Sequence, residues 1–296
     1  MRPVLVLLNP SARSGEHLQA ARQALSEAGL HELRVLETSD SEEAARQLSE
    51  EVAAQAPMVV VGGGDGTLAR AAARLRGSQT ALGILPMGSG NTFARSLRLP
   101  LQIPAAAKVI AAQHRRQVDV GEVNGILFLN SVTLGLSAAI VEELNSKLKR
   151  RYGLLAWPIA ALRLTHRHLR EMQLELEEPG GRRQVLRTRQ LVISNGPCIA
   201  ASLIPTGSAS LNNGRLDVFA LGDGHWLGFA SSLLALLSHR SDRSRATHFF
   251  ETTELSVRSA RSLAADVDGD LVTQTPLSIR VHPGALTVLA PPASDA

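Results

Sequence analysis

Short apolar runs alternate with helix-like segments over the first 117 residues. Four runs, at residues 4–8, 33–36, 58–61 and 82–85, have the length and composition of buried strands. Segments with helical spacing of apolar positions lie between and after them, at about residues 16–28, 42–55, 68–75 and 104–114. This order predicts a parallel sheet with helices on both faces, in which the carboxyl ends of the strands share one edge.

The pattern changes after residue 117, where strands dominate. Residues 118–123 and 126–131 flank Asn124-Gly125, a strong hairpin turn. Further strands are predicted at residues 172–177, 183–193, 216–221, 249–258, 262–265, 271–273 and 277–282. The sequence therefore predicts two domains, an α/β domain over residues 1–117 and an antiparallel β-sandwich over residues 118–284.

Two helical patterns interrupt the second domain, at residues 147–170 and 226–239. Their apolar faces are bordered by basic residues and tryptophan. Such a face suits packing against the sheet, and it also suits contact with a membrane interface.

The strand at residues 58–61 runs into a glycine loop that leads into a helix. The loop holds Gly63, Gly64, Asp65, Gly66 and Thr67. Glycines allow a ligand to approach the backbone closely, and the N–H groups at a helix start attract an anion. A phosphate cradle that contains a carboxylate implies a metal ion such as Mg²⁺ between the two negative charges. The alternative is a plain glycine turn in which Asp65 caps the next helix.

A second loop of the same kind follows the strand at residues 82–85. It holds Gly88, Ser89 and Asn91 and again leads into a helical pattern. Loops that follow neighbouring parallel strands meet at the carboxyl edge of the sheet, where open α/β sheets bind ligands. We therefore expect the two loops to form one nucleotide-binding site.

Together the two loops resemble the diacylglycerol kinase catalytic domain, and in particular the small bacterial lipid kinases of that family, from residue 4 to about residue 288. The first loop alone is shared with NAD kinases and 6-phosphofructokinases, so the pair is the more specific signal. The resemblance implies ATP and Mg²⁺ as cofactors, with further nucleotide contacts from Asn9 and Thr38. It also implies that a last strand, at about residues 285–290, returns to the first domain.

The resemblance assigns the acid–base chemistry to carboxylates. Relatives carry an Asp-Gly-Glu motif whose glutamate accepts the proton, whereas this chain has Asp268-Gly269-Asp270. Asp270 takes the place of that glutamate with one methylene less, and Asp65 is the other candidate base. The expected metal ligands are Asp65, Asp119 and Asp270.

Two further positions depart from the family pattern. Ser137 stands where relatives commonly carry an aspartate near the lipid headgroup. Asn213 stands where relatives carry an aspartate that holds a structural Mg²⁺. These departures put the choice of lipid and the structural metal in question.

Composition narrows the class of partner. The 296-residue chain has a net charge of +4 and 3% aromatic residues, and it has no recognisable nucleic-acid motif, so nucleic acid is not an expected partner. A basic excess at residues 147–189 favours anionic lipid. One cysteine, Cys198, allows no internal disulfide, and neither a signal peptide nor a membrane-spanning segment is expected. These features predict a cytoplasmic protein that is peripheral at the inner face of the membrane, and they leave a homodimer open.

The sequence thus predicts an ATP-dependent lipid kinase that transfers a γ-phosphoryl group to a lipid hydroxyl, with a diacylglycerol-like lipid as the expected substrate. One alternative is a non-catalytic nucleotide or lipid sensor of the same fold, because Asp270 and Ser137 depart from the family pattern. Another is an NAD kinase-like enzyme, which would share the first loop but not the second.

Overall fold

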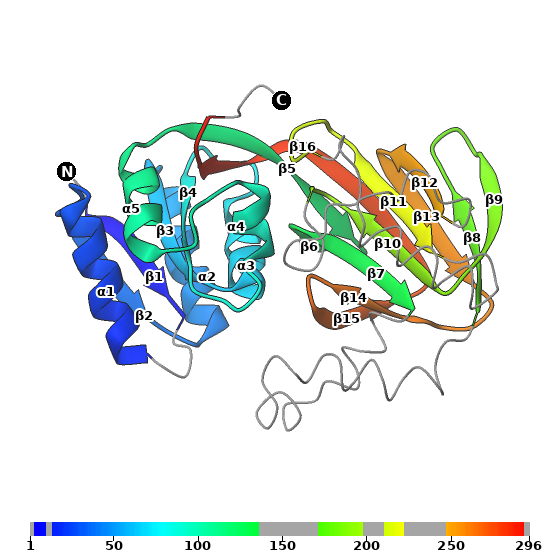
Figure 1. Ribbon diagram of the computed structural model, residues 1–296, viewed down its shortest axis with the longest axis horizontal. Coiled ribbons are helices and arrows are strands. Elements are labelled where there is room, and N and C mark those ends of the chain that lie inside the picture. Colours follow the sequence, from blue (N-terminus) through cyan, green and yellow to red (C-terminus); the bar gives the residue numbers. More distant parts are fainter. Residues whose placement is uncertain (1–2, 10–13, 136–170, 198–209, 222–246, 293–296) are drawn as a thin grey trace.

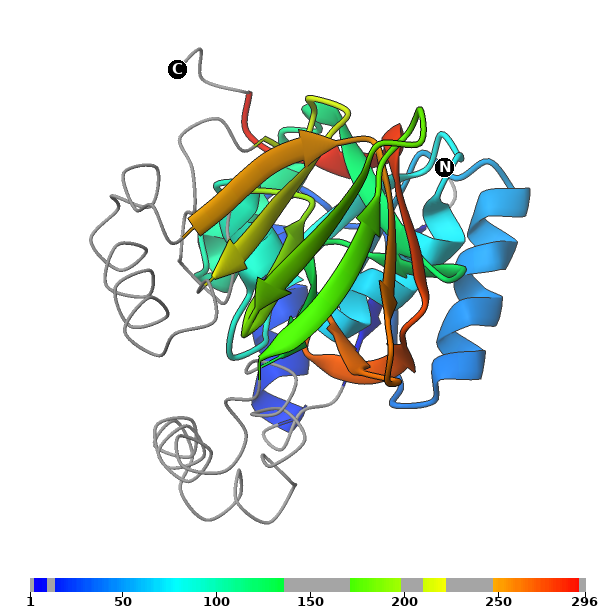
Figure 2. The same ribbon diagram turned by 90° about the vertical axis from the view of Figure 1, so that its right-hand side faces the viewer.

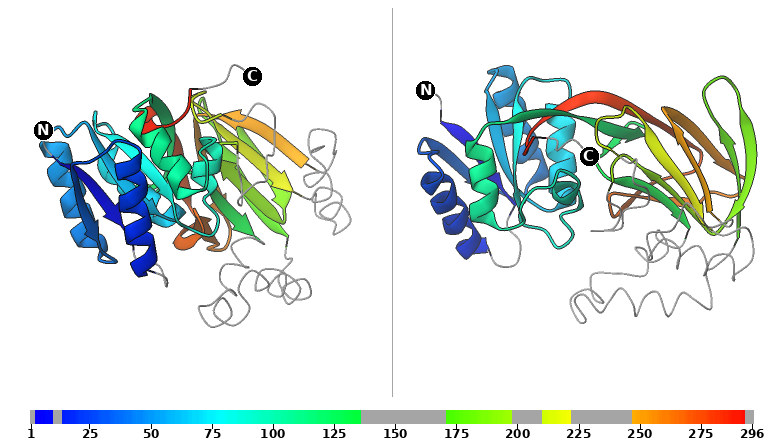
Figure 3. Two further views of the ribbon diagram at one scale, coloured as in Figure 1. Left: turned by 60° about the vertical axis from the view of Figure 1, so that its left-hand side comes forward. Right: turned by 45° about the horizontal axis from the view of Figure 1, so that its top comes forward.

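The computed structural model describes residues 3–9, 14–135, 171–197, 210–221 and 247–292. An α/β domain lies beside a domain built from antiparallel strands, and two long strands run between them (Figures 1 and 3). The predicted fold class, an α/β domain followed by an antiparallel β-sandwich, is confirmed.

The first domain is a parallel sheet with strand order β2-β1-β3-β4. Its helices follow the strands in the predicted alternation. The strands are β1 (Val4–Leu8), β2 (Leu33–Glu37), β3 (Met58–Gly63) and β4 (Ala81–Pro86). The helices are α1 (Ser14–Glu27), α2 (Ser41–Ala53), α3 (Asp65–Leu75), α4 (Thr92–Ser96) and α5 (Ile103–Ala111).

Alternate residues of each buried strand face opposite helix layers. Leu5 and Leu7 pack with apolar residues of α2 and α3, whereas Val6 and Leu8 pack with those of α1 and α5. All four side chains are at most 2% exposed. A strand covered on both faces reads as a continuous apolar run, which is why these strands were predictable from the sequence.

The second domain consists of two facing sheet layers (Figure 2). One layer is a six-stranded sheet in the order β12-β11-β10-β7-β14-β15. Its strands are β7 (Ser131–Gly135), β10 (Gln190–Ser194), β11 (Leu216–Leu221), β12 (Thr247–Thr252), β14 (Ala264–Val267) and β15 (Asp270–Gln274). The opposite layer contains β5 (Arg115–Val123), β6 (Ile126–Phe128), β8 (Met172–Glu177), β9 (Arg183–Thr188), β13 (Glu254–Ser259) and β16 (Leu277–Leu289).

The strand β16 joins the two domains. It pairs with β13 and β5 in antiparallel fashion and, at Val288, with Leu82 of β4 in parallel fashion. One ten-stranded sheet therefore runs through both domains. The two strands predicted at residues 277–282 and 285–290 are one 13-residue strand with a register shift between His282 and Leu286.

Two other strand predictions were wrong because each joined two strands into one. The segments at residues 183–193 and 249–258 are each divided into two strands, β9 with β10 and β12 with β13, that belong to different sheets. The helices predicted at residues 147–170 and 226–239 lie outside the described residues. Among the helices that the structure does describe, none has the length and hydrophobicity needed to cross a membrane.

Candidate active site

The first glycine loop joins β3 to α3, as the sequence predicts. Gly64 is the N-cap of α3, and Asp65 lies in its first turn. The carboxylate of Asp65 accepts backbone N–H bonds from Thr92 at 3.1 Å and from Phe93 at 3.0 Å. Asp65 therefore caps α4, which follows the second loop, instead of its own helix, and it ties the two loops together.

The second glycine loop packs directly against the first. A Cβ atom on Gly88 would lie 2.5 Å from the Cα atom of Gly64, which is too close for any side chain at position 88. Only glycine therefore allows the two loops to approach this closely. Asn91 has a left-handed backbone with φ 50°. Its side chain accepts a hydrogen bond from the Gly88 N–H at 2.9 Å and donates one to the Gly88 carbonyl at 2.8 Å. Asn91 thus shapes the loop, and Ser89 is exposed at its tip.

Asn9 and Thr38 lie at the ends of the neighbouring strands. The Asn9 side chain donates to the Thr67 hydroxyl at 2.8 Å, which links the end of β1 to the start of α3. The Thr38 hydroxyl donates to the Glu43 carboxylate at 3.0 Å. All these residues except Glu43 line a hollow between α2 and α3, over Leu7 of β1. The hollow lies where the strand order changes direction, between β2-β1 and β3-β4, which is the usual ligand position in such sheets.

Asp270 comes from the second domain and reaches the first loop. It begins β15, in the hairpin that β15 forms with β14. Its Oδ2 atom lies 3.6 Å from the position that a Cβ atom of Gly66 would occupy. The Asp270 side chain is exposed and forms no hydrogen bond or ion pair with any described residue. A free carboxylate therefore faces the N-terminus of α3.

Asp268 holds the turn that carries Asp270. Its carboxylate accepts backbone N–H bonds from Leu129 at 2.7 Å, Asn130 at 2.8 Å and Ser131 at 3.0 Å. Burial raises the pKa of Asp268 to about 6; the three N–H bonds act in the opposite direction, and the charge of Asp65 adds to the increase. The sequence motif contained Asp268, but this anchoring role was not predicted.

Asn130 connects the two acids Asp65 and Asp268, and its role was not predicted from the sequence either. Its amide nitrogen lies 3.4 Å from Oδ1 of Asp65, while its backbone N–H binds Asp268. The side chain is 5% exposed, and its Oδ1 atom has no hydrogen-bond partner among the described residues. The sequence signal that could have indicated this role is a polar residue at the end of an apolar strand. Asn130 is therefore a buried acceptor next to the glycine loops.

Asp119 has a different environment from Asp65 and Asp270. Its two carboxylate oxygens accept backbone N–H bonds from Gly214 at 2.7 Å and from Gly284 at 2.8 Å. The Asn213 side chain accepts a hydrogen bond from the Arg215 N–H at 3.0 Å. Asp119 thus holds two turns together, and Ser137, the other departure from the family pattern, lies outside the described residues.

The expected metal ligands do not form one cluster. Within the described ranges, no group of three or more His, Cys, Asp or Glu side chains is placed to hold a metal ion. Asp270 has free oxygens beside the loops, and Asp65 keeps lone pairs beyond its backbone bonds. These two residues fit a Mg²⁺ ion that arrives with phosphate oxygens and keeps most of its water. Asp119, with both oxygens engaged by glycine N–H groups, does not join them.

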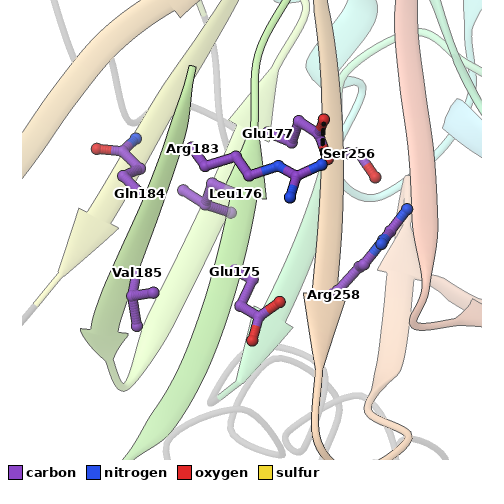
Figure 4. Close-up of a pocket in the computed structure, with 8 residues that line it drawn as sticks. All are labelled: Glu175, Leu176, Glu177, Arg183, Gln184, Val185, Ser256 and Arg258. Atoms are coloured by element: carbon purple, nitrogen blue, oxygen red, sulfur yellow. Dashed lines mark hydrogen bonds and ion pairs between the residues drawn. The ribbon is translucent and has the colours of Figure 1, made fainter. Parts of the chain in front are cut away.

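A second hollow lies on the far side of the molecule, over β8, β9 and β13 (Figure 4). Its charged side chains include Glu175, Glu177, Arg183 and Arg258. Arg183 pairs with Glu177 at 3.1 Å. This hollow is at the opposite end of the ten-stranded sheet from the glycine loops, so we assign it no part in their chemistry.

Family models match both parts of the chain. Residues 3–123 match the diacylglycerol kinase catalytic domain, and residues 130–290 match the YegS C-terminal NAD kinase beta sandwich-like domain. A Pseudomonas aeruginosa protein named "Probable lipid kinase YegS-like" is 33% identical over 98% of this chain and 95% of its own. A Pseudomonas fluorescens protein of the same name is 30% identical over 98% of this chain and 96% of its own.

Solved structures show the same fold at lower sequence identity. A diacylglycerol kinase from Bacillus anthracis has a TM-score of 0.80 and 22% identity, covering 98% of each chain. Yeast NADH kinase in complex with NADH has a TM-score of 0.51 and 11% identity, covering 98% of this chain and 84% of its own. These structures show the fold alone, whereas the family models and the curated relatives above lead to one assignment: the chain belongs to the YegS-like lipid kinases, which carry the diacylglycerol kinase catalytic domain.

Proposed function

We propose that this protein is an ATP-dependent lipid kinase that transfers the γ-phosphoryl group to a lipid hydroxyl, with a diacylglycerol-like lipid as the acceptor. Membership of the lipid kinase family supports the reaction class. The observation that carries the proposal is the approach of Asp270, from the second domain, to Gly66 at the start of α3. A free carboxylate is thereby held beside the backbone N–H groups that favour a phosphate.

The nucleotide would occupy the hollow between α2 and α3, with its phosphates toward the two glycine loops. Asn9, Thr38 and Thr67 line this hollow and offer polar groups to the nucleotide. Gly64 and Gly88 allow the two loops to pack against each other, since a Cβ atom on Gly88 would lie 2.5 Å from the Cα atom of Gly64. Asp65 keeps the two loops in contact, and Mg²⁺ bound with ATP would neutralise part of the phosphate charge.

Asp270 is the proposed general base. The lipid hydroxyl gives its proton to the Asp270 carboxylate while its oxygen bonds to the γ-phosphorus, the bond to the β–γ bridging oxygen breaks, and ADP leaves. The lipid would enter along the second domain, from a membrane surface that the protein contacts peripherally on its cytoplasmic side. The shorter side chain of aspartate still reaches the loop because the hairpin holds it against α3.

The test is transfer of radiolabelled phosphate from ATP to a total lipid extract. Wild-type protein should label a lipid, and Asp270→Asn should lower the rate by roughly 100-fold or more, because it removes the base. Asp270→Glu should retain activity, since it keeps the carboxylate. Glu175→Gln is the matched control, because Glu175 is an exposed carboxylate in the distant hollow.

Three outcomes would contradict the proposal. Full activity of Asp270→Asn would remove Asp270 as the base. Tight binding of Mg-ATP without transfer to any lipid would instead support a sensor. Labelling of NAD in place of lipid would support an NAD kinase-like activity.

A further inference from the structure

Arg70 lies one helical turn after Gly66 on α3. Helical side chains lean toward the N-terminus of their helix, so Arg70 points back toward the glycine loop. Its Nη1 atom lies 3.9 Å from the position that a Cβ atom of Gly66 would occupy, and Oδ2 of Asp270 lies 3.6 Å from the same position. Arg70 and Asp270 therefore face one open space from two different domains.

The glycine loops have no positive side chain of their own. Residues 62–67 and 86–92 contain neither lysine nor arginine. Arg95, just beyond the second loop, donates its Nε–H to the Gly90 carbonyl at 3.1 Å. Arg76, at the far end of α3, pairs with Glu122 at 2.7 Å. These two guanidinium groups are thus already engaged.

Arg70 differs from both. It is exposed, and within the described part of the chain it forms no hydrogen bond or ion pair. It also lines the hollow between α2 and α3, together with Thr67 and Asn9. A triphosphate that follows the hollow toward Asp270 would therefore pass an unpaired guanidinium.

We propose that Arg70 binds the terminal phosphate of the nucleotide and so sets the preference for ATP over ADP. This inference rests on the proposed kinase function. A guanidinium can donate two parallel N–H bonds to phosphate oxygens, and a fixed positive charge beside the transferred group stabilises the transition state. Arg70 exchanges no proton in this step, because Asp270 receives the proton of the acceptor hydroxyl.

The experiment measures binding of ATP, ADP and adenosine by calorimetry in Mg²⁺ buffer. Arg70→Ala should weaken ATP binding by roughly 10-fold or more, ADP binding by less, and adenosine binding not at all, because only ATP carries the phosphate that Arg70 contacts. Arg70→Lys should restore part of the loss. Arg46→Ala is the matched control, because Arg46 is an exposed arginine of α2 that pairs with Glu50 on the surface.

The outcomes separate this inference from the proposed function. If wild-type protein binds ATP and Arg70→Ala binds it as tightly as Arg46→Ala does, the role of Arg70 is refuted while the kinase proposal stands. If ATP and adenosine weaken equally, Arg70 contacts the nucleoside and not the phosphate. If wild-type protein binds no ATP, both proposals fail. The melting temperature of Arg70→Ala should equal that of wild type. A large decrease would instead indicate that Arg70 holds the two domains together.

Discussion

Asp268 and Asp270 are two residues apart but have opposite surroundings. Asp268 is saturated by three backbone N–H bonds, whereas Asp270 has no side-chain partner in the described structure. One acid anchors the turn and the other is presented by it. Substitution of Asp268 should therefore affect stability, whereas substitution of Asp270 should affect activity.

We expect Asp268→Ala to lower the free energy of unfolding by about 3 kcal/mol or more, because three backbone N–H groups lose their acceptor. Asp268→Asn should cost less, since asparagine tolerates the positive φ of 52° and keeps one oxygen. Asp270→Asn should leave stability unchanged while activity falls. Urea denaturation with parallel kinase assays measures both, and an unchanged midpoint for Asp268→Ala would contradict the anchoring role.

Asp217 predicts a pH dependence of stability. Burial raises its pKa to about 6, with a smaller contribution from Glu251 on the neighbouring strand, and its Oδ1 atom has no hydrogen-bond partner in the part of the chain that the structure describes. Because the folded-state pKa is the higher one, stability is greatest below the usual pKa of about 4 and declines as the pH rises to about 6. Asp217→Asn should therefore stabilise the protein at pH 7.5 by on the order of 2 kcal/mol and make no difference near pH 4.

The measurement is chemical denaturation of wild-type and Asp217→Asn proteins at several pH values. Glu251→Gln should give a smaller gain in the same direction, since it removes only the repulsion between the two carboxylates. A variant less stable than wild type at pH 7.5 would show that ionised Asp217 is not a source of instability.

The sequence predicted residues whose role is local and missed those whose role is distant. The glycines and Asp65 follow one strand directly, so their place at the edge of the sheet could be inferred. The partners of Asp65 lie 27 and 28 residues further along, in a different helix. Which helix start a carboxylate caps depends on tertiary packing, which sequence spacing does not encode.

At the scale of elements, two threonines mark the points where strands change sheets. The Thr188 hydroxyl donates to the Gln190 carbonyl at 2.9 Å, where β9 ends and β10 begins. The Thr252 hydroxyl donates to the Glu254 carbonyl at 2.6 Å, where β12 ends and β13 begins. Threonine is a good strand residue, so each segment reads as one continuous strand. The side-chain bond to the backbone, which creates the corner, is visible only in the structure.

Glu122 of β5 connects three elements. Its carboxylate pairs with Arg76 beyond α3 at 2.7 Å and with His282 of β16 at 3.0 Å, and it also binds Arg280. Burial opposes its ionisation, but the bonds from Arg76, Arg280 and His282 outweigh burial and lower the pKa to about 2. Glu122 therefore fixes the end of α3, whose other end carries the glycine loop, against the strands shared by both domains.

Glu122→Gln should destabilise the protein by about 1 to 2 kcal/mol at pH 7. The expected loss is modest because Arg76 and Arg280 are partly exposed, and solvent weakens their ion pairs with Glu122. Because the folded-state pKa is lowered, this contribution is present above about pH 4.5 and is lost as the pH falls toward 2. Denaturation curves should show a smaller difference in stability between wild type and Glu122→Gln at pH 3 than at pH 7. A difference that grew at low pH would contradict the ion-pair explanation.

At the scale of the molecule, β5 and β16 belong to two hydrophobic cores at once. Val118 and Leu286 lie in the core of the first domain, whereas Val123 and Ile279 lie in the core of the second. The sequence predicted the domains from the change in pattern at residue 117, but a strand that continues from one core into the next gives no such change. The boundary at residues 117 and 118 stays a prediction, and it falls inside β5.

Because both cores share these two strands, we expect the domains to unfold in one cooperative transition. Leu286→Ala, in the core of the first domain, and Leu176→Ala, in that of the second, each remove a leucine that is at most 1% exposed, at a cost of about 2–5 kcal/mol. Each variant should lower a single melting temperature by several degrees in scanning calorimetry, and near-UV and far-UV circular dichroism should report the same midpoint. Two separate transitions, of which each substitution shifts only its own, would mean that the shared strands do not couple the domains. In that case the contact between Asp270 and the first glycine loop would change as the two domains move relative to each other. Saturating Mg-ATP should then merge the two transitions into one, because it would bind to both domains.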